Sequence, residues 1–590
     1  MENLFVENVR EKLFGVLKAV NRYPLAVTFL GITAIVNILM IQSDEQQYAN
    51  LFWTFIIGAF LSVVFQQVYE RFFFTMKQRL SLQVVAVLLT VGYYFAIRSA
   101  ATFNMEAEIK TTVIIFALSM VLIWIPSIKN KILFNETFMA TFKAFFITFL
   151  FTAVIAIGLN LSIFAVDQLL VPVDGKVYAH VFNLIFTLFA PIFFLSLIPL
   201  YPGRGGRMTD EQKTQLAHAI TCPKTLASLL SYVLIPLTGL YTLILLVYIL
   251  LNIGGKFWTN NLLEPLLVSY AITVILVTVL AGSLTDSFAS FSKKVFPKVL
   301  LPIVLFQLVA SALKIGEIGI THGRYYVLLF GLFALVSSII FSFFPVQKSG
   351  RIAMFLIGFA AVSIIPPVDA FTISRVNQTN MLQKTLSVND MFVEGKILPN
   401  SDISTADKKK ITETVQYLSS MQYAKEINWL PDKLEHGNVF RETFGFDQVY
   451  DEGNTVNNGK SVYVDWEQHP VIDINNYDRL VRFYLYQPTT NKQERNVFPM
   501  HIDDVKYDLV QEFEDGKMHL IFKDDEKEFM RFDLKAALDE ILMNQGELSI
   551  EEATITKDNE EVRMTVIANT IDVYDGSYSG EINVLIEVKK

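Results

Sequence analysis

Long apolar stretches separated by short polar segments fill the chain up to about Ile365. A membrane-spanning helix needs about 20 predominantly apolar residues, and about 17 to 25 is the usual range. Eleven stretches approach this length, the shortest with help from flanking residues: Pro24–Ile41, Leu51–Tyr69, Leu82–Ile97, Thr111–Ile125, Phe138–Val166, Val181–Leu200, Leu226–Leu251, Leu262–Ala281, Val299–Leu313, Tyr326–Phe344 and Ile352–Ile365. The pattern predicts a polytopic α-helical membrane domain of about eleven transmembrane helices over residues 23–368.

Residues 1–22 have a different pattern. Apolar residues recur at helical spacing with charged residues opposite them: Phe5, Val9, Leu13, Val16 and Val20. Acids and bases are mixed, and no short apolar core ends in small residues, so this is not a typical secretory signal. We expect an amphipathic helix on the cytoplasmic membrane surface. A partly ordered polar tail is the alternative.

The remaining chain reads as a polar domain in two segments. Residues 369–453 are helix-rich, with Ile411, Val415 and Leu418 on one face of a helix that Ser404 or Thr405 would cap. Residues 454–590 contain short alternating stretches bounded by Asp, Asn and Gly, which are typical of strands. We therefore predict an α+β extracytoplasmic domain with a mixed, mainly antiparallel sheet or a sandwich.

Charge divides the chain in the same place. Over all 590 residues the net charge is −8, but it is +8 up to Ala370 and −16 from Phe371 onward. A basic apolar part followed by an acidic polar part is typical of a membrane domain joined to a water-soluble one. The charge of −16 argues against nucleic acid and other polyanions as partners.

The basic residues also predict an orientation, because cytoplasmic loops carry an excess of Lys and Arg. Eighteen lie in the N-terminal segment and the loops on its side of the membrane: Arg10, Lys12, Lys18, Arg22, Arg71, Lys77, Arg79, Lys129, Lys131, Arg204, Arg207, Lys213, Lys224, Lys293, Lys294, Lys298, Lys348 and Arg351. Six lie in the opposite loops: Arg98, Lys110, Lys176, Lys256, Lys314 and Arg324. We expect a multi-pass protein of the cell membrane with a cytoplasmic N-terminus. Eleven crossings would then place the C-terminal domain outside the cytoplasm.

The longest predicted cytoplasmic loop, residues 201–225, separates six helices from five. This division suggests an internal repeat, although no residue-level match joins the halves. The loop contains Cys222, which is the one cysteine of the chain and so excludes an intrachain disulfide. Charged residues are sparse within the spans, and no carboxylate lies at mid-membrane, which argues against an ion-coupled transporter.

Two groups of residues could carry chemistry. Asp44 and Glu45 lie in the first predicted outer loop, where many membrane-embedded transferases that act on lipid-linked donors place acidic residues. Asp465, Glu467 and His469 alternate along one predicted strand, so they share a face that could bind a divalent cation. A solvated acidic strand face is the more common interpretation. The chain lacks a Gly-rich phosphate loop, HExxH and GxSxG, and we predict no cofactor or metal.

From about Lys224 to Gln378 the chain resembles a widespread bacterial family of polytopic membrane proteins, the DUF4153-like proteins, whose function is unknown. Four segments carry the resemblance: SYVLIPLTGLYTLIL from Ser231, FPKVLLP from Phe296, GITHGRY from Gly319 and PPVDAFTISRVNQ from Pro366. The chain departs from the family in having Ile318 where members often have Tyr, and Pro366 where Gly is more usual. The resemblance implies an architecture but no mechanism.

The resemblance also singles out motif residues, namely Pro236, Pro302, Thr321, Arg324, Tyr325, Pro367, Phe371, Ser374 and Gln378. Arg324 and Tyr325 would open a helix at the membrane interface as an anchor pair. Because a cation near a helix N-terminus is unfavourable, Arg324 needs a partner such as Glu317 or an anionic headgroup. Pro366 and Pro367 would end the last helix. Ser374 and Gln378 would then cap or bridge the departing chain as a rigid hinge.

Three functions remain open. The first is an envelope scaffold, sensor or accessory subunit whose outer domain binds an envelope protein or a cell-wall component. It rests on the absence of catalytic motifs and on the distinct outer domain. The second is a transporter or channel, and the third is a membrane-embedded transferase with a lipid-linked substrate. The lipid bilayer is the partner common to all three, and the oligomeric state is not determined by the sequence.

Overall fold

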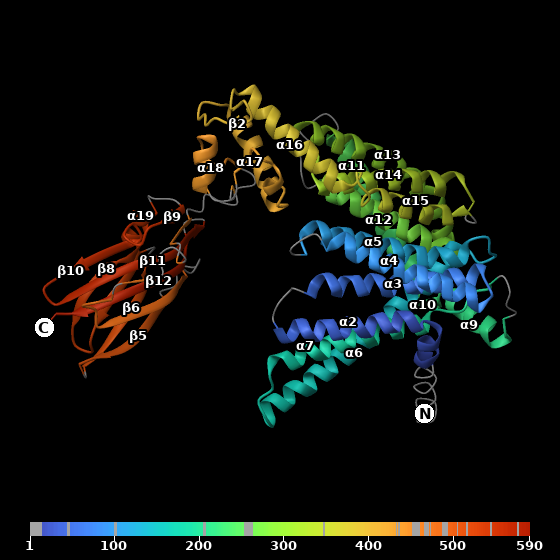
Figure 1. Cartoon of the computed structure of the whole chain (residues 1–590), viewed down its shortest axis with the longest axis horizontal. Coiled ribbons are helices and arrows are strands. Elements are labelled where there is room, and N and C mark those ends of the chain that lie inside the picture. Colours follow the sequence, from blue (N-terminus) through green and yellow to red (C-terminus); the bar gives the residue numbers. More distant parts are fainter. Residues whose placement is uncertain are drawn as a thin grey trace. The chain divides into compact units, whose positions relative to one another are not determined.

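The computed structural model divides the chain into two units, Met1–Asn380 and Met381–Lys590 (Figure 1). It describes residues 15–43, 48–98, 103–203, 208–252, 263–345, 348–431, 434, 437–450, 461–464, 466, 471–472, 474–486, 494–503, 505–514, 517–542, 546–574 and 577–589. Among these described residues, ten helices of the first unit are long and apolar enough to cross a membrane, and Gly350–Val362 is a shorter apolar helix. The predicted polytopic α-helical membrane domain is therefore confirmed.

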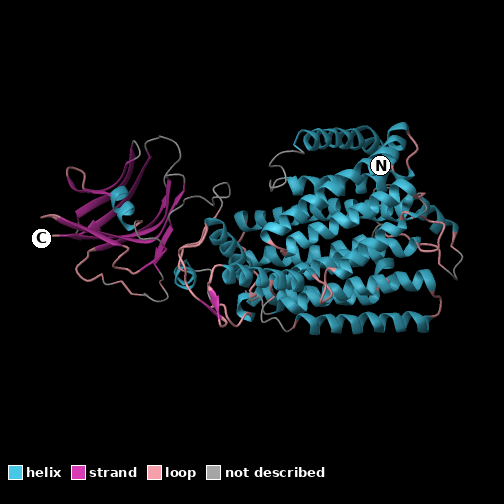
Figure 2. Ribbon diagram, turned by 90° about the horizontal axis from the view of Figure 1, so that it is seen from above, coloured by secondary structure: helices cyan, strands magenta, loops and turns pink. Residues whose placement is uncertain are grey.

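The first unit is a bundle of long helices that lie side by side (Figure 2). Its first group of elements is α2 (Pro24–Ser43), α3 (Ala49–Phe72), α4 (Met76–Ile97), α5 (Met105–Trp124), α6 (Phe134–Leu169), α7 (Gly175–Asn183), η3 (Leu184–Phe189) and α8 (Ala190–Leu197). The second group is α9 (Asp210–Ile220), α10 (Lys224–Leu229), η4 (Leu230–Leu234), α11 (Ile235–Asn252), α12 (Leu263–Leu280), α13 (Ser287–Ile318), α14 (His322–Phe343), α15 (Gly350–Val362) and α16 (Ala370–Val388). Every predicted span corresponds to one of these helices or to a continuous run of three elements, which is α7, η3 and α8 for one span and α10, η4 and α11 for another.

Proline shapes several of these helices. The elements η3 and η4 are π-helical turns, and Pro191 and Pro236 follow them within two residues. Because proline lacks the amide donor of an i→i−4 bond, the preceding turn widens to satisfy its carbonyls elsewhere. Pro302 lies inside α13. The last span, α15, ends at Val362. Pro366 disfavours helical geometry in the residue before it, and neither Pro366 nor Pro367 has an amide hydrogen to donate to a helical bond.

Residues 15–22 are helical, and residues 1–14 lie outside the described part of the chain. The described end of this helix packs onto the bundle rather than standing apart from it. Ala19 and Tyr23 are buried in a core cluster with Val63 and Leu122, and the Tyr23 hydroxyl accepts a bond of 2.9 Å from the Gln67 amide. This segment is thus held by α3 and α5 of the first unit.

Two polar clusters mark opposite ends of the helical unit. At one end the Arg22 guanidinium forms a two-pronged ion pair with Glu70, at 2.9 and 2.7 Å, and Arg71 at the end of α3 donates to the carbonyl of Ile128, just beyond α5. At the other end Lys110, in the second turn of α5, contacts Asp369, which follows α15. Because α5 runs from one cluster to the other, the start of α2 and the segment after α15 lie at opposite ends of the bundle.

The second unit begins with helices and a small hairpin and continues as two sheets. Its first part contains β1 (Phe392–Val393), β2 (Lys396–Ile397), α17 (Thr405–Ser420) and α18 (Gly437–Phe444), and Ser404 caps α17. The first sheet has the order β4 (Arg479–Tyr486), β12 (Ser577–Val588), β11 (Val562–Tyr574), β3 (Ser461–Val464) and β9 (Gly546–Leu548), with β10 (Thr554–Asp558) also on β11. The second sheet has the order β5 (Glu494–Ile502), β6 (Val505–Glu514), β7 (Lys517–Lys523) and β8 (Glu528–Asp533).

The two sheets share one hydrophobic core, to which α19 (Leu534–Ile541) also contributes. Leu485 of β4, Val566 of β11, Leu509 of β6 and Leu520 of β7 are all fully buried in this core. Among the described strands only β3 and β9 pair in parallel, and all other pairs are antiparallel. Buried and more exposed residues alternate along β4, as the sequence pattern predicts, whereas β12 carries a continuous buried run from Ile582 to Ile586.

Candidate functional site

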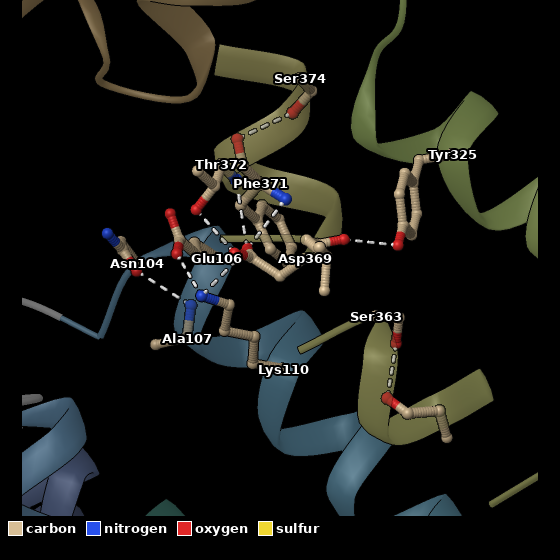
Figure 3. Close-up of polar contacts among 12 residues, drawn as sticks. Asn104, Glu106, Ala107, Lys110, Tyr325, Ser363, Asp369, Phe371, Thr372 and Ser374 are labelled. Carbon is tan, nitrogen blue, oxygen red and sulfur yellow. Dashed lines mark hydrogen bonds and ion pairs between the residues drawn. The ribbon is translucent and has the colours of Figure 1, made fainter. Parts of the chain in front are cut away.

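Two of the motif segments, GITHGRY and PPVDAFTISRVNQ, come together with the start of α5 at one end of the helical unit (Figure 3). We call Glu106, Lys110, Tyr325, Asp369 and Phe371 the exit cluster, because the chain leaves the bundle here along α16. Its members come from α5, α14 and the turn between α15 and α16. Residues far apart in the sequence thus form one cluster of contacts where the chain leaves the bundle.

The contribution of α5 is an acidic and a basic residue one turn apart. Asn104 caps the helix by accepting a 3.0 Å bond from the Ala107 amide, and Glu106 lies in the first turn, where the helix dipole favours an anion. The Lys110 ammonium lies 2.7 Å from a carboxylate oxygen of Glu106 and 3.4 Å from one of Asp369. Lys110 therefore sits between two carboxylates, as Figure 3 shows.

The Asp369 side chain is completely buried. It caps α16, since its carboxylate accepts bonds from the amides of Phe371 and Thr372, both at 3.1 Å, and from the Thr372 hydroxyl at 2.6 Å. Burial favours the protonated form, but these hydrogen bonds and the Lys110 charge outweigh it and lower the pKa of Asp369 below its ordinary value. The carboxylate is thus held as an anion.

Phe371 supplies the apolar wall of the exit cluster and is only 1% exposed. The Lys110 ammonium lies 5.2 Å from the centre of its ring, within the range of a cation–π contact. The His322 ring stacks on it at 5.7 Å, and Tyr326 meets it edge-on at 6.5 Å. Phe371 therefore joins the start of α16 to both α5 and α14.

A second set of bonds holds α16 to the loop between α13 and α14. The Tyr325 hydroxyl donates to the carbonyl of Val368 at 2.6 Å. The Gln378 amide donates to the carbonyls of Ile318 and Ile320 at 3.1 and 3.3 Å, and Asn377 accepts a 2.7 Å bond from the Ile320 amide. These bonds hold the first turn and the middle of α16 against the helical unit.

The motif residues at this loop have local roles. Thr321 caps α14 by accepting from the Arg324 amide, and the Arg324 guanidinium donates to the Gly319 carbonyl at 3.4 Å. Gly319 has a φ of 73°, a left-handed conformation that glycine adopts at little cost. The Glu317 side chain lies outside the described residues, so its predicted pairing with Arg324 remains a prediction.

The structure gathers seven of the nine motif residues in this region: Thr321, Arg324, Tyr325, Pro367, Phe371, Ser374 and Gln378. The Ser374 hydroxyl donates to the Phe371 carbonyl from within α16, so it lies inside the helix and not at its cap, whereas Gln378 bridges to the neighbouring loop. Pro236 and Pro302 lie elsewhere, in α11 and α13. The candidates Asp44, Glu45, Asp465, Glu467 and His469 lie outside the described residues.

Sequence reasoning missed the charged core of the exit cluster. From the sequence, Lys110 is identified only as a cation of a predicted outer loop, and Asp369 only as a member of the segment PPVDAFTISRVNQ. The i, i+4 spacing of Glu106 and Lys110 is a recognisable signal of a helical ion pair. The spacing cannot reveal Asp369, because the pairing of Asp369 with Lys110 depends on how α5 packs against α15.

The hydrogen-bond acceptors of Asp369 in the exit cluster are already occupied by donors of the protein itself. The Asp369 oxygens are occupied by two amides, one hydroxyl and one ammonium. Within the described residues no group of three or more His, Cys, Asp or Glu side chains could hold a metal ion. This arrangement can fix the start of α16, and it offers no free acid, base or nucleophile at Asp369.

Replacing Asp369 should weaken the helical unit. Asp369→Asn keeps a cap but removes the negative partner of Lys110, so we expect the free energy of unfolding to fall by about 1–3 kcal/mol. Asp369→Ala also removes the cap and should cost about 1 kcal/mol more. Denaturation in detergent measures both effects. Glu108→Gln, an exposed change in the same turn of α5 as Glu106, is the control and should stay within about 0.5 kcal/mol of the wild type.

The lowered pKa of Asp369 also predicts a pH dependence. The folded protein holds the proton less tightly than the unfolded chain, so the carboxylate stabilises the fold fully above the unfolded pKa of about 3.9. This stability is lost as the pH falls through the lower pKa of the folded state. We expect the wild-type melting temperature to fall below about pH 4 more steeply than that of Asp369→Asn. Parallel curves for the two proteins would contradict the assignment.

Comparison with known proteins gives a match to the helical unit and α16. A family model described as "Domain of unknown function (DUF4153)" matches residues 21–390. Comparisons with curated proteins and with solved structures gave no match. The family match begins before α2 and ends just after α16, so it covers the helices before Lys224 as well as the segments that carry the resemblance. It spans more than half of the chain and contains the whole exit cluster, and the protein therefore belongs to the DUF4153 family.

Proposed function

We propose that this integral membrane protein is an envelope scaffold, sensor or accessory subunit that holds its C-terminal unit outside the cytoplasm as a binding domain. The observation that carries the proposal is the exit cluster. A buried, fully bonded carboxylate with a lysine partner holds the start of α16, the helix that leads to the second unit, against the bundle. Such a contact suits a protein whose membrane part positions another domain.

The orientation rests on charge and on the helix ends. In the topology predicted from the sequence, the N-terminal segment and the loops on its side of the membrane carry eighteen basic residues, against six in the opposite loops. Arg22, Glu70 and Arg71 lie at the first end, and Asp369 lies at the other. Because basic loops stay in the cytoplasm, this arrangement supports a cytoplasmic N-terminus and an extracytoplasmic second unit.

The chemistry of the second unit suggests the kind of partner it binds. The chain from Phe371 onward has a net charge of −16, so electrostatics disfavour polyanions and favour a neutral or basic surface. An envelope protein or a cell-wall component of that character fits. The two-sheet core is closed and well buried, so recognition would use the outer faces, edges and loops of the sheets.

Thiol labelling in intact cells tests the orientation. Cys222 is the one natural cysteine and lies in the predicted cytoplasmic loop, so it serves as an internal control. Ser401→Cys places a second thiol at an exposed position of the second unit. We expect a membrane-impermeant maleimide to label position 401 in intact cells and Cys222 only after lysis. Labelling of Cys222 alone in intact cells would reverse the topology.

Transfer of the second unit tests the function. A chain that ends at residue 390 retains the whole family region, and a second chain joins residues 381–590 to an unrelated membrane helix of the same orientation. If the membrane part positions a binding domain, the second chain should restore part of the envelope phenotype of a deletion strain and the first should not. Full restoration by the first chain would contradict the proposal and favour transport or catalysis within the bundle.

A further inference from the structure

A large apolar cavity lies among the helices of the first group, away from the exit cluster. Its volume is about 670 Å³, which falls within the roughly 300–1,000 Å³ of ordinary small-molecule sites. Its walls come from α2, α3, α5, α6, η3 and α8. All of these elements belong to the membrane-spanning candidates, so the cavity lies within the part of the protein that the bilayer surrounds.

The lining of this cavity carries no charged side chain. Small residues such as Ala26 and Ala59 make room at its floor, where they are 0% and 5% exposed. The aromatic rings of Phe145 and Phe149 of α6 and Phe186 of η3 line it as well, and they are 55%, 64% and 53% exposed. Since exposed apolar residues on these helices face lipid, the cavity opens sideways toward the bilayer and closes toward the bundle.

Two hydroxyls give the lining an unusual feature. Thr148 and Thr152 of α6 are more than nine-tenths buried, and their hydroxyls have no hydrogen-bond partner within the described residues. Two other hydroxyls of the lining are satisfied, because Ser119 donates to the Ile115 carbonyl at 2.8 Å and Thr187 donates to Asn183 at 2.9 Å. The wall at Thr148 and Thr152 therefore carries two hydroxyls that the described residues leave unpaired.

Chemistry selects the occupant of such a space. A charged ligand would lose its hydration and find only neutral hydroxyls, such as those of Thr148 and Thr152, as partners, which is costly. An apolar acyl chain from the adjacent bilayer has no hydration to lose. It also supplies the dispersion contacts that the walls of an empty void lack. The sideways opening gives it a direct route of entry.

We infer that this cavity binds the acyl chain of a bilayer lipid as a resident ligand of the first group of helices. The chain enters between the exposed rings of α6 and η3 and reaches Val63 and Leu122, which line the floor and are 6% and 8% exposed. The bound chain takes the place of a core side chain. This inference does not depend on the orientation of the second unit.

Photo-crosslinking tests the inference on the unmodified protein. The full chain is reconstituted in vesicles that contain a phospholipid with a photoactivatable group in its acyl chain, and labelled residues are mapped by mass spectrometry. We expect adducts at Val63 or Leu122, which lipids on the outer surface of the bundle do not reach. Adducts confined to exposed residues such as Val154 and Phe164, 63% and 54% exposed, would overturn the inference.

A cavity-filling variant provides an independent test. Ala153→Phe fills the space from α6, and Ala165→Phe makes the same change at an exposed position of α6 outside the cavity. After delipidation in mild detergent, we expect native mass spectra to show one retained phospholipid in the wild type and in Ala165→Phe, and at least a fivefold lower occupancy in Ala153→Phe. Equal occupancy in all three proteins, or retention of an isoprenoid lipid instead, would contradict the assignment.

Discussion

A carboxylate that is entirely removed from solvent, Asp369, sets the geometry at the point where the chain leaves the helical bundle. Removing a single charge from water costs several kcal/mol, and the cost is offset only by good partners. Here the partners are two backbone amides, the Thr372 hydroxyl and Lys110. Because they come from both α5 and α16, the start of α16 cannot move without breaking a contact to a buried charge.

The same physical rule explains where polar residues lie in the rest of the first unit. Charges within lipid are expensive, and the least exposed ion pairs among the described residues of the first unit lie at the two ends of the bundle, at Arg22–Glu70 and at Lys110–Asp369. Basic side chains near the first end also bind backbone carbonyls at helix ends, as Arg71 does with Ile128. Between the ends the large cavity has an apolar lining. Ion pairs thus stabilise the two ends of the bundle, and apolar packing stabilises the region between them.

Much of this architecture could be predicted, because span length and apolar composition are local properties of the sequence. The spans, the helix at Thr405–Ser420 and most long strands follow from such local patterns. β5 gives no clear strand pattern because it contains Pro499 and alternates poorly, and β9 gives none because it has only three residues. The predicted end of the last span at Ile365 lies three residues beyond its observed end, since the effect of Pro366 extends to the residues before it.

The site was harder to predict than the fold. The motif residues around Tyr325 and Phe371 can be recognised in the sequence, but their charged partners cannot. Glu106 and Lys110 made the start of α5 look like a loop, because charged residues end an apolar stretch even where the helix continues. Their role depends on the packing of α5 against α15 and α16, which brings together residues from distant parts of the chain. Periodicity describes one helix at a time, so it cannot show which helix ends meet.

The most direct measurement of the central claim is a double-mutant cycle between Lys110 and Asp369. Unfolding free energies are compared for the wild type, Lys110→Met, Asp369→Asn and the double variant under the same detergent conditions. If the two side chains form one buried contact, the single changes will not add, and the coupling will be about 1–3 kcal/mol. Additive effects within about 0.5 kcal/mol would show that the two charges act separately and would contradict the account of the exit cluster.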